Sequence, residues 1–172
     1  MSAVLEVHNL VKKYGGKTAV DDISFDIQEG EIFSLLGPNG AGKTTTISIL
    51  STLFTPTEGD ASIFGYSVTK NPMEVKRLIG VVPQEIALYD DMTALENLNF
   101  WGEMYGLSGS ALKTRVKELL EQIGLADRAK ERIKTYSGGM KRRVNIAVGL
   151  LHKPRLLLDR KSTRLNSSHG KL

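Results

Sequence analysis

The sequence contains no cysteine among its 172 residues. It therefore has no disulfide framework, which fits a protein from a reducing compartment. The N-terminus, Met1–Glu6, lacks the basic segment followed by an apolar segment that marks a secretory signal peptide. No apolar run approaches the roughly 20 residues that a membrane-spanning helix needs. We therefore expect a soluble chain, long enough for one domain with a substantial core, whose role at any membrane depends on a partner.

Net charge is also absent from most of the chain. The formal charge of the whole sequence is +4, but residues 160–172 contain four basic side chains and no acidic one. Residues 1–159 therefore carry 19 basic and 19 acidic side chains, which balance. Because the basic character belongs to the tail, it does not indicate nucleic-acid binding. We expect no nucleic acid among the partners of this protein.

A glycine-rich segment at residues 37–44 is the most specific motif present. It matches G-x-x-x-x-G-K-[ST], a loop that wraps the phosphates of a nucleotide. Glycine lets the backbone approach the phosphates, and the loop N–H groups form an anion site with the N-terminus of the next helix. The motif predicts that Lys43 reaches the β- and γ-phosphates and that Thr44 offers a hydroxyl to Mg²⁺. The predicted nucleotide-binding residues are Gly37, Pro38, Asn39, Gly40, Ala41, Gly42, Lys43, Thr44 and Thr45.

The alternative for this segment is a plain surface turn before a helix. The flanking sequence favours the phosphate loop, because Glu31–Leu36 is apolar enough for a buried strand and Thr44–Phe54 has the composition of a helix. A strand, then the loop, then a helix is the context that such a motif requires.

Apolar periodicity predicts an α/β chain. Residues Ala3–Val7 and Asp22–Gln28 alternate as half-buried antiparallel strands do. Further strands are expected at Ala61–Phe64, Ile79–Val82 and Arg155–Leu158, the last ending at Asp159. Helices are expected at Asn71–Leu78, over Thr93–Leu125 with a capping box formed by Thr93 and Glu96, and from about Gly138 to His152.

Five features in order resemble the ATP-binding cassette (ABC) ATPases over residues 1–159. They are Tyr14 ahead of the phosphate loop, Gln84 after a strand end, a helical block, Tyr136-Ser-Gly-Gly-Met140 before a helix, and a strand ending at Asp159. The sequences of these motifs are similar, more narrowly, to those of ATPase subunits of bacterial drug, antibiotic or lipid exporters whose permease is a separate chain. The resemblance implies a P-loop core with a mostly parallel sheet, an N-terminal antiparallel β-subdomain and a helical insert at about 85–137.

The resemblance also implies a function and a set of partners. The intact parent would bind ATP and Mg²⁺ and hydrolyse ATP, by attack of water on the γ-phosphate, to drive export through the permease. It would work as a head-to-tail dimer with a second ATPase subunit, in the cytoplasm at the inner face of the cell membrane. The rivals are a non-transport ABC protein of translation or DNA repair, and a nucleotide-binding fragment without catalysis.

Individual residues take roles from the same resemblance. Tyr14 would stack on adenine, although a strand-end tyrosine at a sheet edge is the plain alternative. Gln84 would sense Mg²⁺ and the γ-phosphate, and Asp159 would hold Mg²⁺ together with Thr44. Ser137, Gly138 and Gly139 would bind the γ-phosphate of ATP held by the other subunit; their plain alternative is an ordinary helix N-cap. The apolar segment Glu85–Tyr89 would meet the permease or simply pack on the helical block, and Lys141–Arg143 is expected to be a solvated face.

The family pattern breaks after Asp159. The family needs a glutamate there to polarise the attacking water, and this chain has Arg160. Nothing in residues 160–172 matches the later family elements, so we expect this tail to be disordered or a foreign or misread segment; the alternative is a natural degenerate paralogue. We predict that the polypeptide as written folds poorly and hydrolyses ATP negligibly, since it lacks the general base and one side of its core sheet is unpaired.

Overall fold

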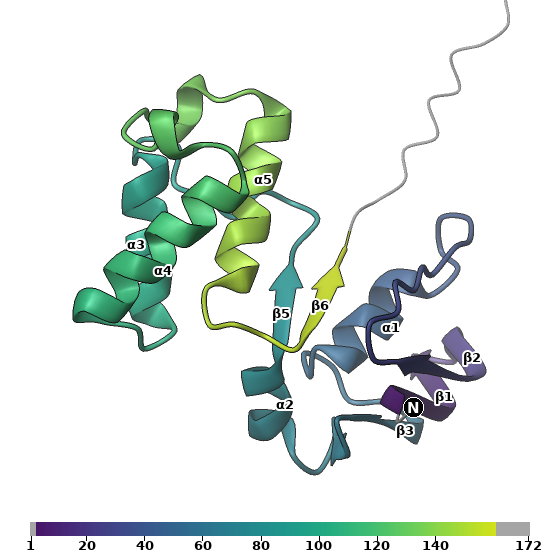
Figure 1. Cartoon of the computed structure of the whole chain (residues 1–172). Helices are drawn as coiled ribbons and strands as arrows, with labels where there is room; N and C mark the ends of the chain where they lie inside the picture. Colours follow the sequence, from purple (N-terminus) through teal and green to yellow (C-terminus); the bar gives the residue numbers. More distant parts are fainter. Residues whose placement is uncertain (1–2, 161–172) are drawn as a thin grey trace, which may run out of the picture.

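The computed structural model describes residues 3–160 and has two parts joined by a pair of parallel strands (Figure 1). The first part contains the antiparallel strands and the helices α1 and α2, and the second contains the helices α3, α4 and α5. In chain order the elements are β1 (Ala3–Tyr14), β2 (Lys17–Gln28), α1 (Lys43–Leu50), β3 (Glu58–Ile63), β4 (Tyr66–Ser67), α2 (Pro72–Leu78), β5 (Ile79–Val82), α3 (Ala94–Met104), α4 (Gly109–Gln122), the 3-10 turns η1 (Ala126–Arg128) and η2 (Ile133–Thr135), α5 (Gly138–Leu150) and β6 (Leu156–Asp159).

The N-terminal sheet is antiparallel, in the order β2-β1-β3-β4, as the alternating pattern predicts. The strands β1 and β2 form a long hairpin whose last pair is Tyr14 with Lys17, so Tyr14 lies at the hairpin tip. The inward side chains of β1, Leu5, Val7 and Leu10, are almost completely buried. They pack with Ile49 and Leu50 of α1, which fixes the helix after the phosphate loop onto the sheet.

The strands β5 and β6 pair in parallel, with Val82 opposite Asp159. Both strands lie where the sequence predicts short apolar strands. Because the pair is parallel, the residues that follow β5 and β6 emerge at the same edge of the sheet (Figure 1). The sequence predicts Gln84 and Asp159 at the ends of two separate strands, and the parallel pairing brings both residues to the same edge of this sheet.

The predicted buried strand at Glu31–Leu36 is wrong. The segment has no strand structure, and Ile32 and Leu36 are 96% and 84% exposed. A strand is stabilised by hydrogen bonds to a neighbouring strand, and none of the strands within residues 3–160 pairs with this segment. Phe33 makes a stacked contact with Phe25 of β2 at 5.0 Å between ring centroids, and Glu31 bonds to Gln28 at the end of the same strand. Within the described residues the parallel sheet consists of β5 and β6 alone.

The helix after the loop also ends earlier than predicted, at Leu50 instead of Phe54. Thr52 has a left-handed backbone with φ of 61°, and the N–H of Leu53 donates to the carbonyl of Ser48 at 2.8 Å. This bond across six residues is the usual closure of a helix C-terminus, so local backbone geometry stops the helix before the apolar pattern does.

The second part is built from α3, α4 and α5. The capping box at the start of α3 is confirmed: Thr93 accepts from the N–H of Glu96 at 3.1 Å, and the N–H of Thr93 donates to the Glu96 carboxylate at 2.7 Å. The predicted helical span then divides at Tyr105–Ser108, where Gly106 has φ of 82°. The buried side chains of α4 are Leu112, Val116, Leu119 and Leu120. No helix of residues 3–160 is long and apolar enough to cross a membrane.

Leu119 is fully buried in the cluster of α3, α4 and α5. We expect Leu119→Ala to lower the free energy of unfolding by about 2–5 kcal/mol, because truncation removes buried methyl groups and leaves a cavity. Lys117→Ala, two residues away with an exposed side chain, should change it by no more than about 0.5 kcal/mol. Urea unfolding of both variants measures the difference. Equal effects would show that this cluster does not contribute to the stability of the fold.

Candidate functional site

The glycine-rich loop is shaped by left-handed backbone at Gly40 and Gly42, whose φ angles are 86° and 80°. Gly42 is the residue at the start of α1, and a Cβ there would collide with the carbonyl oxygen of Ala19 on β2. A Cβ at Gly40 would meet nothing within 4 Å. The loop is thus pressed against β2 on one side and open on the other, which leaves room for a ligand to approach the backbone.

The open side of the loop carries unpaired hydrogen-bond donors. The first helical bond of α1 runs from the N–H of Thr46 to the carbonyl of Gly42 at 2.8 Å. Within residues 3–160 the N–H groups of Lys43, Thr44 and Thr45 have no acceptor. Free N–H groups at a helix N-terminus form an anion site, and the helix dipole adds to it. The residues present therefore fit the phosphates of a nucleotide.

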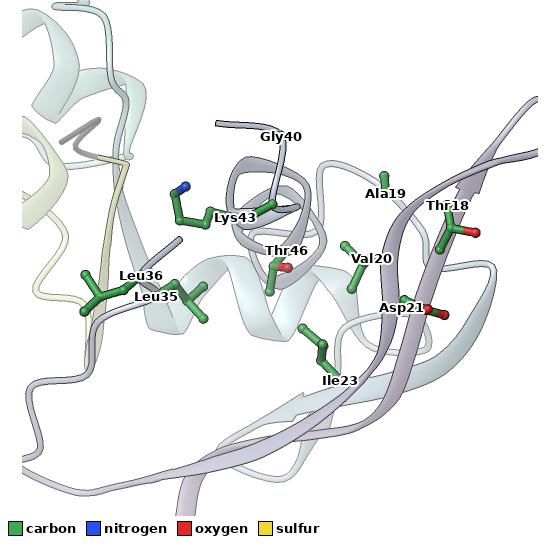
Figure 2. Close-up of a pocket in the computed structure, with 11 residues that line it drawn as sticks. Thr18, Ala19, Val20, Asp21, Ile23, Leu35, Leu36, Gly40, Lys43 and Thr46 are labelled. Carbon is green, nitrogen blue, oxygen red and sulfur yellow. The ribbon is translucent and has the colours of Figure 1, made fainter. Parts of the chain in front are cut away.

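Lys43 lies at the mouth of the same loop. Its ammonium donates to the carbonyl oxygens of Gly37 at 2.5 Å and Pro38 at 2.7 Å. Figure 2 shows its side chain extending away from Val20 and Asp21 of β2. The positive charge is held on the loop itself, where it can neutralise a phosphate that the backbone binds.

A cavity of about 480 Å³ lies beside the loop, between β2 and the segment before the loop (Figure 2). Its walls include the aliphatic side chains of Val20, Ile23, Leu35 and Leu36. These aliphatic side chains offer a phosphate no hydrogen-bond donor, whereas Lys43 and the loop backbone, which line the same cavity, offer several. The donors that a phosphate would need therefore lie on the loop, beside the aliphatic side of the cavity.

Tyr14 lies at the hairpin tip and is 45% exposed. Its ring meets the ring of Phe54 edge to face at 6.4 Å, and the ammonium of Lys12 is 5.0 Å from its centre. These contacts orient the ring while leaving part of its surface in solvent. Stacking of Tyr14 on a nucleobase stays a prediction.

The shared edge of β5 and β6 contains an ion pair that the sequence did not reveal. One guanidinium nitrogen of Arg142 donates to the carboxylate of Asp159, and another donates to the carbonyl of Pro83 at 2.7 Å. Arg142 on α5 therefore joins the end of β6 to the residue just before Gln84. Arg160 comes directly after β6, and its N–H donates to the carbonyl of Val82 at 3.0 Å.

The prediction that Lys141–Arg143 forms a solvated face holds for Arg143 alone. Arg143 is exposed, whereas the side chains of Lys141 and Arg142 are each only 22% exposed. Besides Arg142, Lys141 pairs with Asp90 at 2.7 Å, and Arg143 donates to the carbonyl of Ile123 at 2.6 Å. The three side chains bind partners on three different segments. The partners are distant in the sequence, so the basic run alone could not identify them.

The segment Ser137–Gly139 opens α5 and is exposed. Ser137 is the N-cap, and its hydroxyl accepts from the N–H of Met140 at 3.3 Å. In the described part of the chain the N–H groups of Gly138 and Gly139 have no acceptor, so this helix start offers donors as the phosphate loop does. The helix α5 packs in the cluster of α3, α4 and α5, whereas α1, which follows the phosphate loop, packs on the antiparallel sheet. Figure 1 shows α5 and α1 on opposite sides of the β5–β6 pair.

The residues on either side of this segment are core residues. Tyr136 is buried, and its hydroxyl donates to the carbonyl of Arg128 at 2.6 Å. Burial, with a smaller effect from Glu131, raises the pKa of Tyr136. Met140 is buried in the same cluster. Tyr136 and Met140 thus pack inward and do not carry the exposed donors.

The segment after Gln84 both packs and remains exposed. Leu88 packs against the helical cluster, and Tyr89 contacts the rings of Phe100 and Trp101. Ile86 and Tyr89 are nevertheless 40% and 48% exposed. Packing on the helical block therefore accounts for part of this apolar segment only.

The donor set suits one kind of metal. No group of three His, Cys, Asp or Glu side chains that could hold a metal occurs within the described range. Thr44, Gln84 and Asp159 supply a hydroxyl, an amide and a single carboxylate. Mg²⁺ is usually bound by one or two carboxylates plus the phosphates of a substrate, so these residues fit Mg²⁺ only in company with a nucleotide.

Gly42 provides a test of the loop geometry. We expect Gly42→Ala to destabilise the fold more than Gly40→Ala, because both residues have left-handed backbone but only the first would collide with Ala19. The left-handed backbone costs about 1–2 kcal/mol in each variant, and the collision adds to it at position 42. Thermal unfolding compares the two. Equal losses would contradict the close contact between the loop and β2.

Comparisons with known proteins agree on one family. A family model described as ABC transporter matches residues 20–159. The chain is 54% identical over 155 residues to the linearmycin resistance ATP-binding protein LnrL of Bacillus subtilis, covering 90% of this chain and 50% of that protein. It is 48% identical over 163 residues to the doxorubicin resistance ATP-binding protein DrrA of Mycobacterium tuberculosis, covering 93% and 49%. The chain thus spans about half the length of the curated relatives it matches.

Two solved structures share the fold. One is described as the ATP-binding subunit of an ABC transporter; it matches with a TM-score of 0.77 and 33% identity, covering 91% of this chain and 65% of that one. The other is cbiO1 from Clostridium perfringens, described as part of the ABC transporter complex cbiONQ, with a TM-score of 0.84, 25% identity, and coverage of 92% and 65%.

Proposed function

We propose, since the chain belongs to the ABC transporter family, that it is the nucleotide-binding part of an exporter's ATPase subunit. One observation carries the proposal: the free N–H groups of Lys43, Thr44 and Thr45 at the start of α1, with the ammonium of Lys43 at the same loop. Such a cradle favours a polyphosphate. The resistance proteins that the chain resembles support export as the purpose.

The bound species in this proposal is ATP with Mg²⁺. The loop from Gly37 to Thr45 would hold the phosphates, and Tyr14 would lie against the base. Thr44, Gln84 and Asp159 would hold the metal, which neutralises the charge of the phosphates when it is bound. Of these, Gln84 and Asp159 are supported by their position at one edge of the sheet.

Two partners belong to the same proposal. Gly138 and Gly139 are exposed on a part of the chain separate from the phosphate loop, so a second copy, arranged head to tail, would bring their N–H groups to a nucleotide. A separate membrane permease is the other partner, and the exposed Ile86 and Tyr89 are candidates for contacting it. We place the assembly at the cytoplasmic face of the membrane.

A second candidate is a nucleotide-binding chain that does not hydrolyse ATP. Arg160 occupies the position where the family has its glutamate, and an arginine cannot accept a proton from water near neutral pH. Asp159 is moreover paired with Arg142. This candidate shares the ATP site with the first and differs from it in turnover alone.

Binding and partnership test the proposal together. The protein would be titrated with Mg-ATP by calorimetry, and then coexpressed with a six-span membrane protein encoded next to its gene. We expect ATP binding at one site per chain and copurification with the membrane protein in detergent. Binding without copurification would favour a non-transport ABC protein, and no ATP binding would refute both candidates.

A further inference from the structure

The stretch Pro83–Asp91 connects β5 to the helical part and carries Gln84. Two of the four buried polar side chains of the described chain, Asn145 and Asn97, bond to this stretch. Asn97 on α3 accepts from the N–H of Tyr89 at 2.8 Å and donates to its carbonyl at 3.1 Å. The stretch is therefore held by side-chain contacts and not by strand pairing. Besides the two amides, Arg142 bonds to Pro83, Lys141 to Asp90 and Lys134 to Asp91.

Asn145 on α5 forms hydrogen bonds with the other end of the stretch. Its side-chain oxygen accepts from the N–H of Ala87 at 3.2 Å, and its nitrogen donates to the carbonyl of Pro83 at 3.3 Å. Gln84 lies between these two anchor points and is exposed. Arg142, one turn earlier on α5, donates to the same carbonyl of Pro83.

We propose that Asn145 is a positioning residue for Gln84, holding the Pro83–Ala87 segment against α5. This inference rests on the proposed function, because it gives Gln84 its role at the Mg²⁺ of bound ATP. The same helix begins with Ser137–Gly139. Asn145 therefore ties the metal-binding glutamine of one ATP site to the helix that offers donors to the other site.

The chemistry of the amide is specific to this task. An amide provides one acceptor and two donors, and both types are used here. Asn145→Asp keeps the size and the acceptor for Ala87 but loses the donor to Pro83. Asn145→Leu keeps the size and loses both bonds, and it leaves the N–H of Ala87 without its partner.

The first test is amide hydrogen exchange of the whole chain without nucleotide. We expect exchange at the amide of Ala87, which donates to Asn145, to become about tenfold faster in Asn145→Leu, with Asn145→Asp between it and the wild type. Arg143→Gln is the matched control, because Arg143 lies on the same helix but bonds to Ile123 on the opposite side. Unchanged exchange at the amide of Ala87 in Asn145→Leu would overturn the proposal.

The second test is the Mg²⁺ dependence of ATP binding. We expect Asn145→Leu to weaken binding of Mg-ATP about five- to tenfold and to leave binding of ATP in EDTA within about twofold, because only the metal contact of Gln84 is misplaced. A parallel weakening in both conditions, in step with a lower melting temperature, would assign Asn145 a structural role only and overturn the positioning role.

The two tests separate this inference from the proposed function. If the wild-type chain binds no ATP in either condition, the proposed function fails, and the positioning role at the metal fails with it. If the wild type binds Mg-ATP normally and Asn145→Leu does too, the proposed function stands and the inference about Asn145 is refuted.

Discussion

Replacing Lys43 with alanine is expected to abolish tight binding of Mg-ATP. The wild-type chain at 100 times the Kd of the ligand should gain about 2.7 kcal/mol of stability, which for a chain of this size raises the melting temperature by about 5–10 °C. Lys43→Ala should show almost no such rise. The reason is that the ammonium at the loop mouth is the charge that neutralises the phosphates bound by the backbone.

The design of this experiment separates ligand binding from folding. Lys43 also donates to Gly37 and Pro38, so each variant is compared with itself in the absence of nucleotide. Lys117→Ala removes an exposed lysine on α4, far from the loop in the fold, and should keep the whole shift. A shift in Lys43→Ala equal to that of the wild type would refute the role of Lys43.

The chain as written is expected to hydrolyse ATP at least about 100-fold more slowly than a family member with glutamate after the strand-end aspartate. A general base contributes about 10²–10⁴-fold to such a reaction, and Arg160 cannot act as one. The pair between Asp159 and Arg142 further engages the carboxylate that would hold Mg²⁺. Phosphate release from purified protein measures the rate.

The comparison needs proof that the slow chain still binds its substrate. Binding of Mg-ATP by the same preparation provides that control. A chain that binds Mg-ATP but does not hydrolyse it is impaired in the hydrolysis step and not in substrate binding. Turnover comparable to that of the glutamate-containing homologue would contradict this prediction and would show that another group activates the water.

Local features of the fold were predictable because a few neighbouring residues determine them. The capping box of α3 depends on Thr93 and Glu96, and β5 is an apolar run ended by Pro83. The segment Glu31–Leu36 has an equally apolar sequence, but its burial depends on strands beside it, which no local pattern can supply. Its exposed Ile32 and Leu36 show that composition alone does not make a strand.

The candidate site likewise has features that neighbouring residues determine and features that depend on residues distant in the sequence. The phosphate-loop motif could be predicted from its glycines and Lys43, because all of its defining residues lie within eight consecutive positions of the sequence. Arg142 and Asn145 act across the fold, on Pro83, Ala87 and Asp159, and their partners could not be paired from the sequence. A signal existed for Asn145 alone: it is an amide among the buried residues of α5, beside Val144 and Ala147. The expectations about the tail concern residues 160–172, and all of these except Arg160 lie outside the described residues.

The central claim is that backbone N–H groups of the loop and of the α1 N-terminus hold the phosphates of ATP. Amide NMR spectra of the ¹⁵N-labelled chain, recorded with and without Mg-ATP, test this most directly. We predict that the largest shifts occur at the amides of Gly40, Gly42, Lys43, Thr44 and Thr45. Binding of ATP with these amides unmoved and the shifts elsewhere would contradict the account.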